Sequence, residues 1–167
     1  LEPSRDPKWV AGVISGNRTQ MTQRGKMMIV TLDDGSGTIE VTIFSDLMDQ
    51  KRPIFREDEF LAVFGKVSED RFSGGLRLNA DDALDILSAR SHFGQHISFT
   101  LPENFSIGKL KEVISPWQQE NGMRLMADYV SDGNKCRIDF GKNCLLGPND
   151  ECLNSLNQQF KDVKVVY

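Results

Sequence analysis

The sequence lacks most of the features that assign a function at once. No apolar run approaches the roughly 18 residues that a membrane-spanning helix needs, so we expect no contact with a membrane. Only two histidines and three cysteines occur in 167 residues, and Cys136, Cys144 and Cys152 are too evenly spaced for a zinc-ligand pattern. We therefore expect no metal and no cofactor, and we interpret the cysteines as small hydrophobic residues of a protein from a reducing compartment.

Motifs of catalysis are also missing. The sequence contains no phosphate-binding Walker loop, no GxSxG nucleophile elbow and no HExxH zinc motif. Adjacent carboxylates occur at Asp33-Asp34 and Asp81-Asp82, but no further acidic or basic partner completes a catalytic pair or a magnesium site. We interpret the first pair as turn residues and the second as the end of a strand, and we expect no catalytic centre.

The composition is that of an ordinary globular protein, with 39% hydrophobic and 26% charged residues. Because the chain begins with Leu1 and not with methionine, we expect it to be part of a longer protein. The net charge of −4 argues against a strong nucleic-acid binder. This charge lies in residues 1–89, which hold fifteen acidic and eleven basic side chains, whereas residues 90–167 hold nine of each.

The first half of the chain is predicted to form five short strands and one helix. In the third predicted strand, 37–44, Ile39, Val41 and Ile43 alternate with polar residues, as expected for a strand with one buried face. The helix falls within 45–59, between the third and fourth strands. A β-β-β-α-β-β order predicts a five-stranded Greek-key barrel of the OB type over residues 9–89, preceded by a linker remnant at 1–8. The other predicted strands are 9–18, 26–34, 60–68 and 75–80.

The second half has a different pattern. Strands are predicted at 96–101, 123–130, 135–140 and 162–167. Helical spacing of apolar residues predicts helices over 106–119, with Ser106 as the N-cap, and from Asn149 onward. This β-α-β-β-α-β order predicts a small ferredoxin-like α+β domain over residues 90–167.

An OB barrel binds single strands through its second and third strands and the loops that join strands 1–2 and 4–5. The predicted first loop, 17–26, has three cations and no acidic residue. Cations engage phosphates, and an exposed aromatic ring stacks on a base. Seven residues are candidates for weak binding of single-stranded DNA: Arg18, Arg24, Lys26, Lys66, Arg71, Phe72 and Arg77. The alternative is that these charges are merely solvated and that Phe72 closes the end of the barrel.

Three segments together resemble a known family. TLDDGSGTIEVTIFSD (31–46) is followed at a fixed distance by FLAVFGKVSEDRFSGGLRLNA (60–80) and later by RIDFGKNCLLGPNDECLNSL (137–156). These strings are similar to the C-terminal region of the α subunit of bacterial DNA polymerase III, and the similarity extends from about residue 8 to the end of the chain.

This resemblance implies a place in chromosomal DNA replication in the bacterial cytoplasm. The parent chain would be a DNA-directed DNA polymerase, a nucleotidyltransferase whose catalytic carboxylates lie upstream, so the part present here is expected to be no enzyme. In that family the OB domain contacts single-stranded template. The terminal domain docks on the τ subunit of the clamp loader. The resemblance implies that docking residues lie among Cys144, Phe160, Val163, Val165, Val166 and Tyr167.

Two departures from the family pattern concern the docking domain. Some members end in a second, weak peptide for the sliding clamp, but the matching stretch 162–167 begins with Asp162 in place of a glutamine. Related sequences also carry a tryptophan where this chain has Cys144. The residues at the C-terminus could equally belong to a hydrophobic core.

Two other functions are compatible with the same pattern. OB domains of this type also bind the anticodon in some aminoacyl-tRNA synthetases, so the chain could be an RNA-binding adaptor. Alternatively, both halves could contact only protein, in which case the cations would be dispensable for any binding of nucleic acid.

Overall fold

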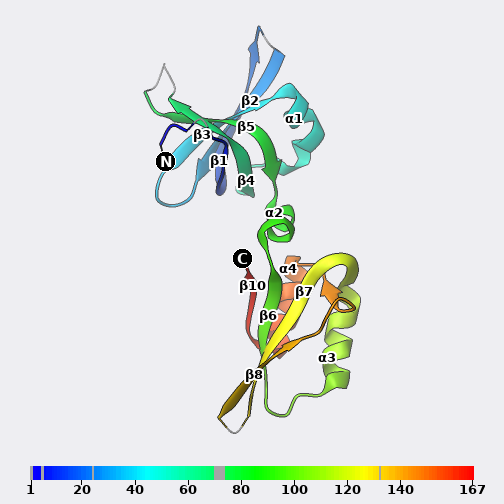
Figure 1. Cartoon of the computed structure of the whole chain (residues 1–167). Coiled ribbons are helices and arrows are strands. Elements are labelled where there is room, and N and C mark those ends of the chain that lie inside the picture. Colours follow the sequence, from blue (N-terminus) through cyan, green and yellow to red (C-terminus); the bar gives the residue numbers. More distant parts are fainter. Residues whose placement is uncertain (1, 5, 24, 70–73, 132) are drawn as a thin grey trace. The chain divides into compact units, whose positions relative to one another are not determined.

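A computed structural model of the protein describes residues 2–4, 6–23, 25–69, 74–131 and 133–167. The chain divides into two compact units, Leu1–Ile86 and Leu87–Tyr167, which are described separately (Figure 1). The sequence interpretation placed this boundary after residue 89. The elements of unit 1 are β1 (Lys8–Thr22), β2 (Gly25–Asp33), β3 (Thr38–Phe44), α1 (Ser45–Lys51), the 3-10 turn η1 (Arg52–Ile54), β4 (Phe60–Glu69) and β5 (Leu76–Leu84).

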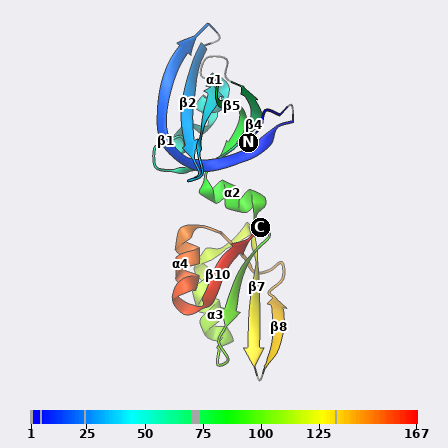
Figure 2. The same ribbon diagram turned by 90° about the vertical axis from the view of Figure 1, so that its left-hand side faces the viewer.

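Unit 1 is a closed five-stranded barrel with the strand order β1-β2-β3-β5-β4 (Figure 2). The pair β3–β5 is parallel, the other pairs are antiparallel, and β4 closes the barrel onto β1. This confirms the predicted OB-type Greek-key barrel. Its interior holds side chains that alternate along each strand, including the fully buried Val30, Val41, Val63 and Leu78.

The turn between β2 and β3 is stabilised by its own acidic side chains. Asp34 Oδ1 accepts hydrogen bonds from the backbone N–H of Ser36 at 2.9 Å and from the Ser36 hydroxyl at 2.7 Å, and these bonds lower the pKa of Asp34. Asp33 Oδ1 accepts from the N–H of Gly35 at 2.8 Å, and Gly35 has a φ of 82° that favours glycine. The structure thus supports the interpretation of Asp33-Asp34 as turn residues.

The connection between β1 and β2 differs from the prediction. Residues 17–26 were expected to form a loop, but β1 continues to Thr22 and β2 begins at Gly25, with the two strands paired up to their ends. Most side chains of residues 17–22 are exposed. A hairpin arm that is polar on both faces has no apolar alternation, so the period of two that reveals a strand was missing from the sequence.

Helix α2 (Ile86–Phe93) begins at the last residue of unit 1 and otherwise belongs to unit 2. The other elements of unit 2 are β6 (His96–Leu101), α3 (Ile107–Ile114), the 3-10 turn η2 (Ser115–Trp117), β7 (Gln118–Ser131), β8 (Asn134–Asp139), β9 (Leu145–Leu146), α4 (Asp150–Gln159) and β10 (Lys161–Val166). Asn149 caps α4, because its side-chain oxygen accepts a hydrogen bond from the N–H of Cys152 at 2.7 Å. Ser106 is at the N-cap position of α3, but its side chain makes no capping hydrogen bond. The predicted strands and helices exist, but the helix predicted over 106–119 ends at Ile114, and Gln118 and Gln119 already belong to β7. The sequence reasoning missed α2 and β9.

The sheet of unit 2 does not confirm the ferredoxin-like arrangement. Its strand order is β10-β6-β7-β8, with β9 paired to β7. A split β-α-β unit leaves a third strand between its two parallel strands. Here β6 and β7 are direct parallel neighbours joined through α3, and β8 pairs with β7 from the other side. The linear order of the elements was correct, but that order does not determine which strands become neighbours.

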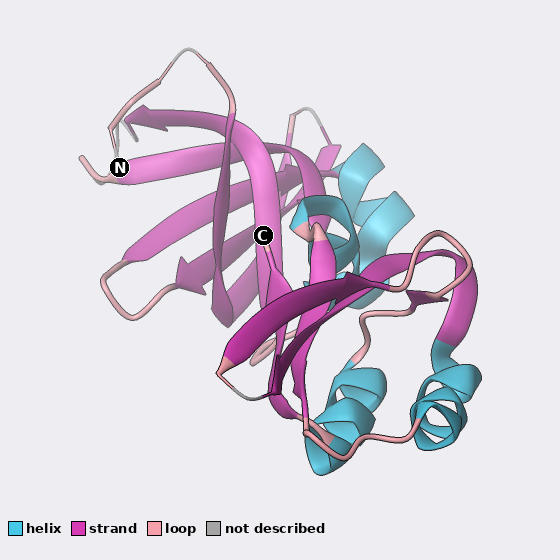
Figure 3. Cartoon of the chain, turned by 60° about the horizontal axis from the view of Figure 1, so that its bottom comes forward, coloured by secondary structure: helices cyan, strands magenta, loops and turns pink. Residues whose placement is uncertain are grey.

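The helices α3 and α4 cover one face of this sheet (Figure 3). Leu110 of α3 and Leu156 of α4 pack in one core with Ile97, Phe99 and Leu125, which share a face of β6 and β7. Two of the three cysteines, Cys144 and Cys152, belong to this core, and burial raises the pKa of Cys152 to about 11. Cys136 on β8 is exposed, so the interpretation of the cysteines as small hydrophobic residues of the core does not extend to it.

Candidate nucleic-acid interface

The outside of the barrel over β2, β3 and β5 forms a continuous surface. Its side chains alternate with those of the core, and the strand register aligns them in rows: Arg18 is opposite Ile29, Ile29 opposite Thr42, and Thr42 opposite Asn79. A second row joins Thr31, Glu40 and Arg77. We call this surface the outer face; it comprises Arg18, Met27, Ile29, Thr31, Glu40, Thr42, Phe44, Arg77 and Asn79, of which Ile29 and Thr42 are covered by their neighbours and buried.

Two of the predicted phosphate-binding residues are joined on the outer face by one carboxylate. Arg18 Nη2 donates to Glu40 Oε1 at 2.6 Å, and Arg77 Nη2 donates to Glu40 Oε2 at 2.7 Å. These hydrogen bonds hold the pKa of Glu40 below its usual value, and the bond from Arg18 has the largest effect. The segment 17–26 itself contains no acidic residue, but the barrel brings Glu40 of a different strand to Arg18, a contact that the sequence reasoning did not anticipate.

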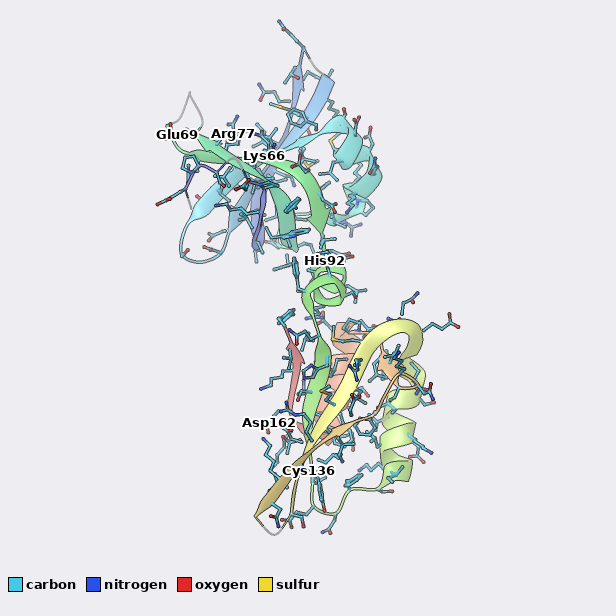
Figure 4. All side chains as sticks on the ribbon, in the orientation of Figure 1. Lys66, Glu69, Arg77, His92, Cys136 and Asp162 are labelled. Atoms are coloured by element: carbon cyan, nitrogen blue, oxygen red, sulfur yellow. The ribbon has the colours of Figure 1, made fainter. Side chains whose placement is uncertain are left out.

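The other predicted binding residues do not all lie on the outer face. Lys66 is exposed on β4, opposite Asn79, and Figure 4 labels it with Arg77 on the same part of the barrel. Lys26 is exposed at the start of β2, but strand alternation directs it away from the side that carries Met27 and Ile29. Arg24, Arg71 and Phe72 lie outside the described residues.

The outer face also carries an exposed aromatic residue that the sequence reasoning missed. Phe44 is the last residue of β3, pairs with Met27 across the hairpin, and is 41% exposed. The signal was present in the sequence: Thr38, Glu40 and Thr42 face outward, and one further step of two residues reaches Phe44. An exposed ring on the same surface as guanidinium groups is a combination that binds single-stranded nucleic acids.

The concavities of unit 1 suit a nucleic acid less well than the outer face does. An open concavity of about 590 Å³ is lined by Asp33, Asp34 and Asp58 together with apolar residues such as Val13 and Phe60. Carboxylates repel a polyanion, so this side of the barrel is a poor phosphate site. Within the parts of the chain that the structure describes, no group of three or more His, Cys, Asp or Glu residues could hold a metal ion.

In unit 2 the candidate docking residues separate into two groups. Cys144 is 8% exposed, and Phe160, Val163 and Val165 pack partly against the core. These four side chains therefore contribute mainly to the hydrophobic core of unit 2 and offer little surface to a partner. Tyr167 is 62% exposed, and Val166 is half-buried beside it. The backbone C=O of Val166 accepts a hydrogen bond from Gln95 N–H at 2.7 Å, which fixes the end of β10 to the segment before β6.

None of the helices in the described ranges is long and apolar enough to cross a membrane.

The closed barrel and the charged, partly aromatic outer face define a class of protein. Residues 8–86 match the family model tRNA_anti-codon, described as an OB-fold nucleic acid binding domain. A replication protein A heterotrimer bound to single-stranded DNA shows a weak likeness, with a TM-score of 0.43 and 18% identity over 82% of this chain and 35% of that one. The fold assignment therefore rests on the strand order and the family model.

Homologues narrow the class further. The chain is 33% identical to the DNA polymerase III subunit alpha of Pseudomonas aeruginosa over 163 residues and 31% identical to that of Escherichia coli (strain K12) over 151 residues. These alignments cover 96% and 87% of this chain. The homologues of the chain are thus DNA polymerase III α subunits. The chain spans 14% and 13% of the length of these two relatives.

Proposed function

We propose that this chain is a C-terminal region of a bacterial DNA polymerase III α subunit and acts in chromosomal DNA replication in the cytoplasm. Both units are included in the alignment to the α subunits, which covers 96% of the chain for the Pseudomonas aeruginosa relative. We assign no catalytic role to these 167 residues, and we place the nucleotidyl transfer of the parent polymerase elsewhere in its length.

In this proposal, unit 1 binds single-stranded DNA weakly through the outer face. The observation that carries it is the presence of Arg18, Arg77 and the exposed ring of Phe44 on one surface of an OB barrel. Guanidinium groups engage successive phosphates while the ring stacks on a base. Weak binding is expected, because unit 1 as a whole is acidic and Glu40 forms ion pairs with both arginines.

The test is a titration of the full chain with fluorescently labelled oligo-dT, followed by anisotropy. Binding should fall with salt, with a slope of about −0.7 per phosphate contact in a double-logarithmic plot, and duplex of equal length should bind less well. Replacing Arg18 and Arg77 with Ala should weaken binding. Replacing Lys109 and Lys111 of unit 2 removes the same charge and is the matched control. Equal affinity for duplex, or equal loss in the control, contradicts the proposal.

Unit 2 is proposed to dock on the τ subunit of the clamp loader through the end of β10. Support comes from the exposure of Tyr167, which directly follows the edge strand β10. Tyr167→Ala in the full chain should weaken binding to the C-terminal region of τ about 30-fold, as for a central interface aromatic. Val130→Ala, at an apolar residue 41% exposed on β7, is the control. An unchanged affinity of Tyr167→Ala contradicts this surface.

The same test with the sliding clamp in place of τ addresses the weak clamp contact. Because Val163 and Val165 pack against the core, we expect any such contact to involve only Val166 and Tyr167.

An RNA-binding adaptor is a second candidate, since the family model that matches unit 1 bears the name of an anticodon-binding domain. Comparing oligo-dT with oligo-U of equal length in the titration above separates the two functions. A clear preference for RNA would favour the adaptor. If neither strand binds at low salt, a module that contacts only protein is the better description.

A further inference from the structure

Glu40 holds the two arginines of the outer face by both of its carboxylate oxygens. The three side chains come from β1, β3 and β5, so only the closed barrel brings them together. A carboxylate and a phosphate offer a guanidinium group the same pair of oxygen acceptors in nearly the same geometry. A phosphate that approaches Arg18 or Arg77 therefore meets donors that are already directed at an acceptor of its own kind.

The exposure of the three groups makes exchange feasible. The side chains of Arg18, Glu40 and Arg77 are 56%, 32% and 24% exposed, so the ion pairs are open to water and to ligand. Exposed ion pairs of this kind contribute little to stability, because water and salt screen them. The two guanidinium groups and the carboxylate also sum to a single positive charge, which lowers the attraction of the outer face for a polyanion.

We propose that Glu40 is a built-in competitor of the nucleic-acid phosphates for Arg18 and Arg77 and thereby sets the low affinity of the outer face. The inference rests on the proposed binding of single-stranded nucleic acid by unit 1. A strand binds by displacing Glu40 from at least one arginine, so each contact replaces an ion pair and adds little net affinity. Because the contact is weak, the DNA strand can bind to the outer face and also dissociate readily when it has to move.

Glu40→Gln tests this directly, because glutamine keeps the shape of the side chain and removes its charge. Anisotropy with oligo-dT should show affinity about three- to tenfold higher at low salt, as expected when two weak surface ion pairs no longer compete. The salt slope should become steeper by about 0.7 for each additional phosphate contact. In a chain that also carries Arg18→Ala and Arg77→Ala, Glu40→Gln should give no gain.

Asp128→Asn is a closely matched control. Asp128 in unit 2 is also a carboxylate between two cations, with Arg137 Nε at 2.9 Å and Lys135 Nζ at 3.1 Å. This variant removes the same charge from the chain and should leave DNA binding unchanged. An equal gain in both variants would show a general effect of net charge and overturn the proposal.

The remaining outcomes are equally decisive. If the wild-type chain binds oligo-dT and Glu40→Gln binds equally or more weakly, Glu40 is not a competitor, while the proposed function stands. If neither protein binds, the proposed function of unit 1 fails together with the inference. In a Trp117→Phe background, the fluorescence of Trp9, which packs against Phe64 with ring centroids 5.3 Å apart, reports whether each unit 1 variant is folded. In a Trp9→Phe background, the fluorescence of Trp117 reports the same for Asp128→Asn.

Discussion

Replacing Phe44 tests whether a DNA base stacks on the exposed ring of the outer face. Removing the ring with Phe44→Ala should weaken binding of oligo-dT, since a base stacked on an aromatic side chain contributes about 1–3 kcal/mol. Only 41% of Phe44 is exposed, so part of the ring is already covered by the barrel. We therefore expect the lower end of that range, about 1 kcal/mol, which corresponds to a loss of about fivefold in affinity.

Two further variants make the Phe44 experiment decisive. Phe44→Trp offers a larger ring and should bind at least as tightly as the wild-type chain, so the two substitutions should act in opposite directions. Phe93 of unit 2 is exposed to a similar degree, 37%, and Phe93→Ala serves as the control. If Phe44→Ala binds oligo-dT as well as the wild-type chain while it remains folded, bases do not stack at this position and the reasoning is refuted.

Three other predictions concern the stability and reactivity of the chain. Gly65→Ala should destabilise unit 1 by about 3 kcal/mol or more in urea unfolding, since a Cβ at Gly65 would lie 2.0 Å from the backbone oxygen of Asn79. The hydrogen bonds from its two cations lower the pKa of Asp128 to about 2, so this carboxylate stabilises unit 2 above its usual pKa of 3.8, and that contribution is lost as the pH falls towards 2. Asp128→Asn should therefore flatten the loss of stability between pH 4 and pH 2, measured by thermal unfolding. A thiol reagent should label one cysteine, Cys136, in the native chain and all three in urea.

The two tryptophans allow each unit to be followed separately. Trp9 lies in unit 1 and Trp117 in unit 2. Trp117→Phe leaves a reporter of unit 1 for the Gly65 experiment, and Trp9→Phe leaves a reporter of unit 2 for the Asp128 experiment. Stability of Gly65→Ala equal to that of the wild-type chain, an unchanged acid transition of Asp128→Asn, or labelling of two native thiols would each contradict the packing described above.

The barrel was predictable because its information is local. The alternation of Ile39, Val41 and Ile43 and the glycine turn before them determine the β2–β3 hairpin from adjacent residues alone. The start of α4 at Asn149 was also predictable from nearby residues, and the side chain of Asn149 accepts a hydrogen bond from a backbone N–H three residues away. The cap predicted at Ser106 was wrong, since its side chain makes no capping hydrogen bond. Alternation also contained the position of Phe44, although the sequence reasoning did not extend it that far.

The features that could not be predicted from the sequence depend on contacts between residues far apart along the chain. Glu40 is 22 residues from Arg18 and 37 from Arg77, and only the barrel register places it between them. The strand order of unit 2 likewise depends on whether β6 and β7 become direct neighbours, which element order alone does not reveal. The exposure of Cys136 follows from its place on the strand β8, beyond the core that holds Cys144.

The central claim is that unit 1 binds single-stranded DNA through the outer face. The most direct measurement is a titration of the isotopically labelled full chain with oligo-dT, followed residue by residue through backbone amide NMR shifts. The account predicts progressive shifts of Arg18, Thr42, Phe44 and Asn79, with little change at Asp58 on the acidic side of the barrel. Shifts confined to the acidic side or to unit 2, or no shifts at low salt, would contradict it.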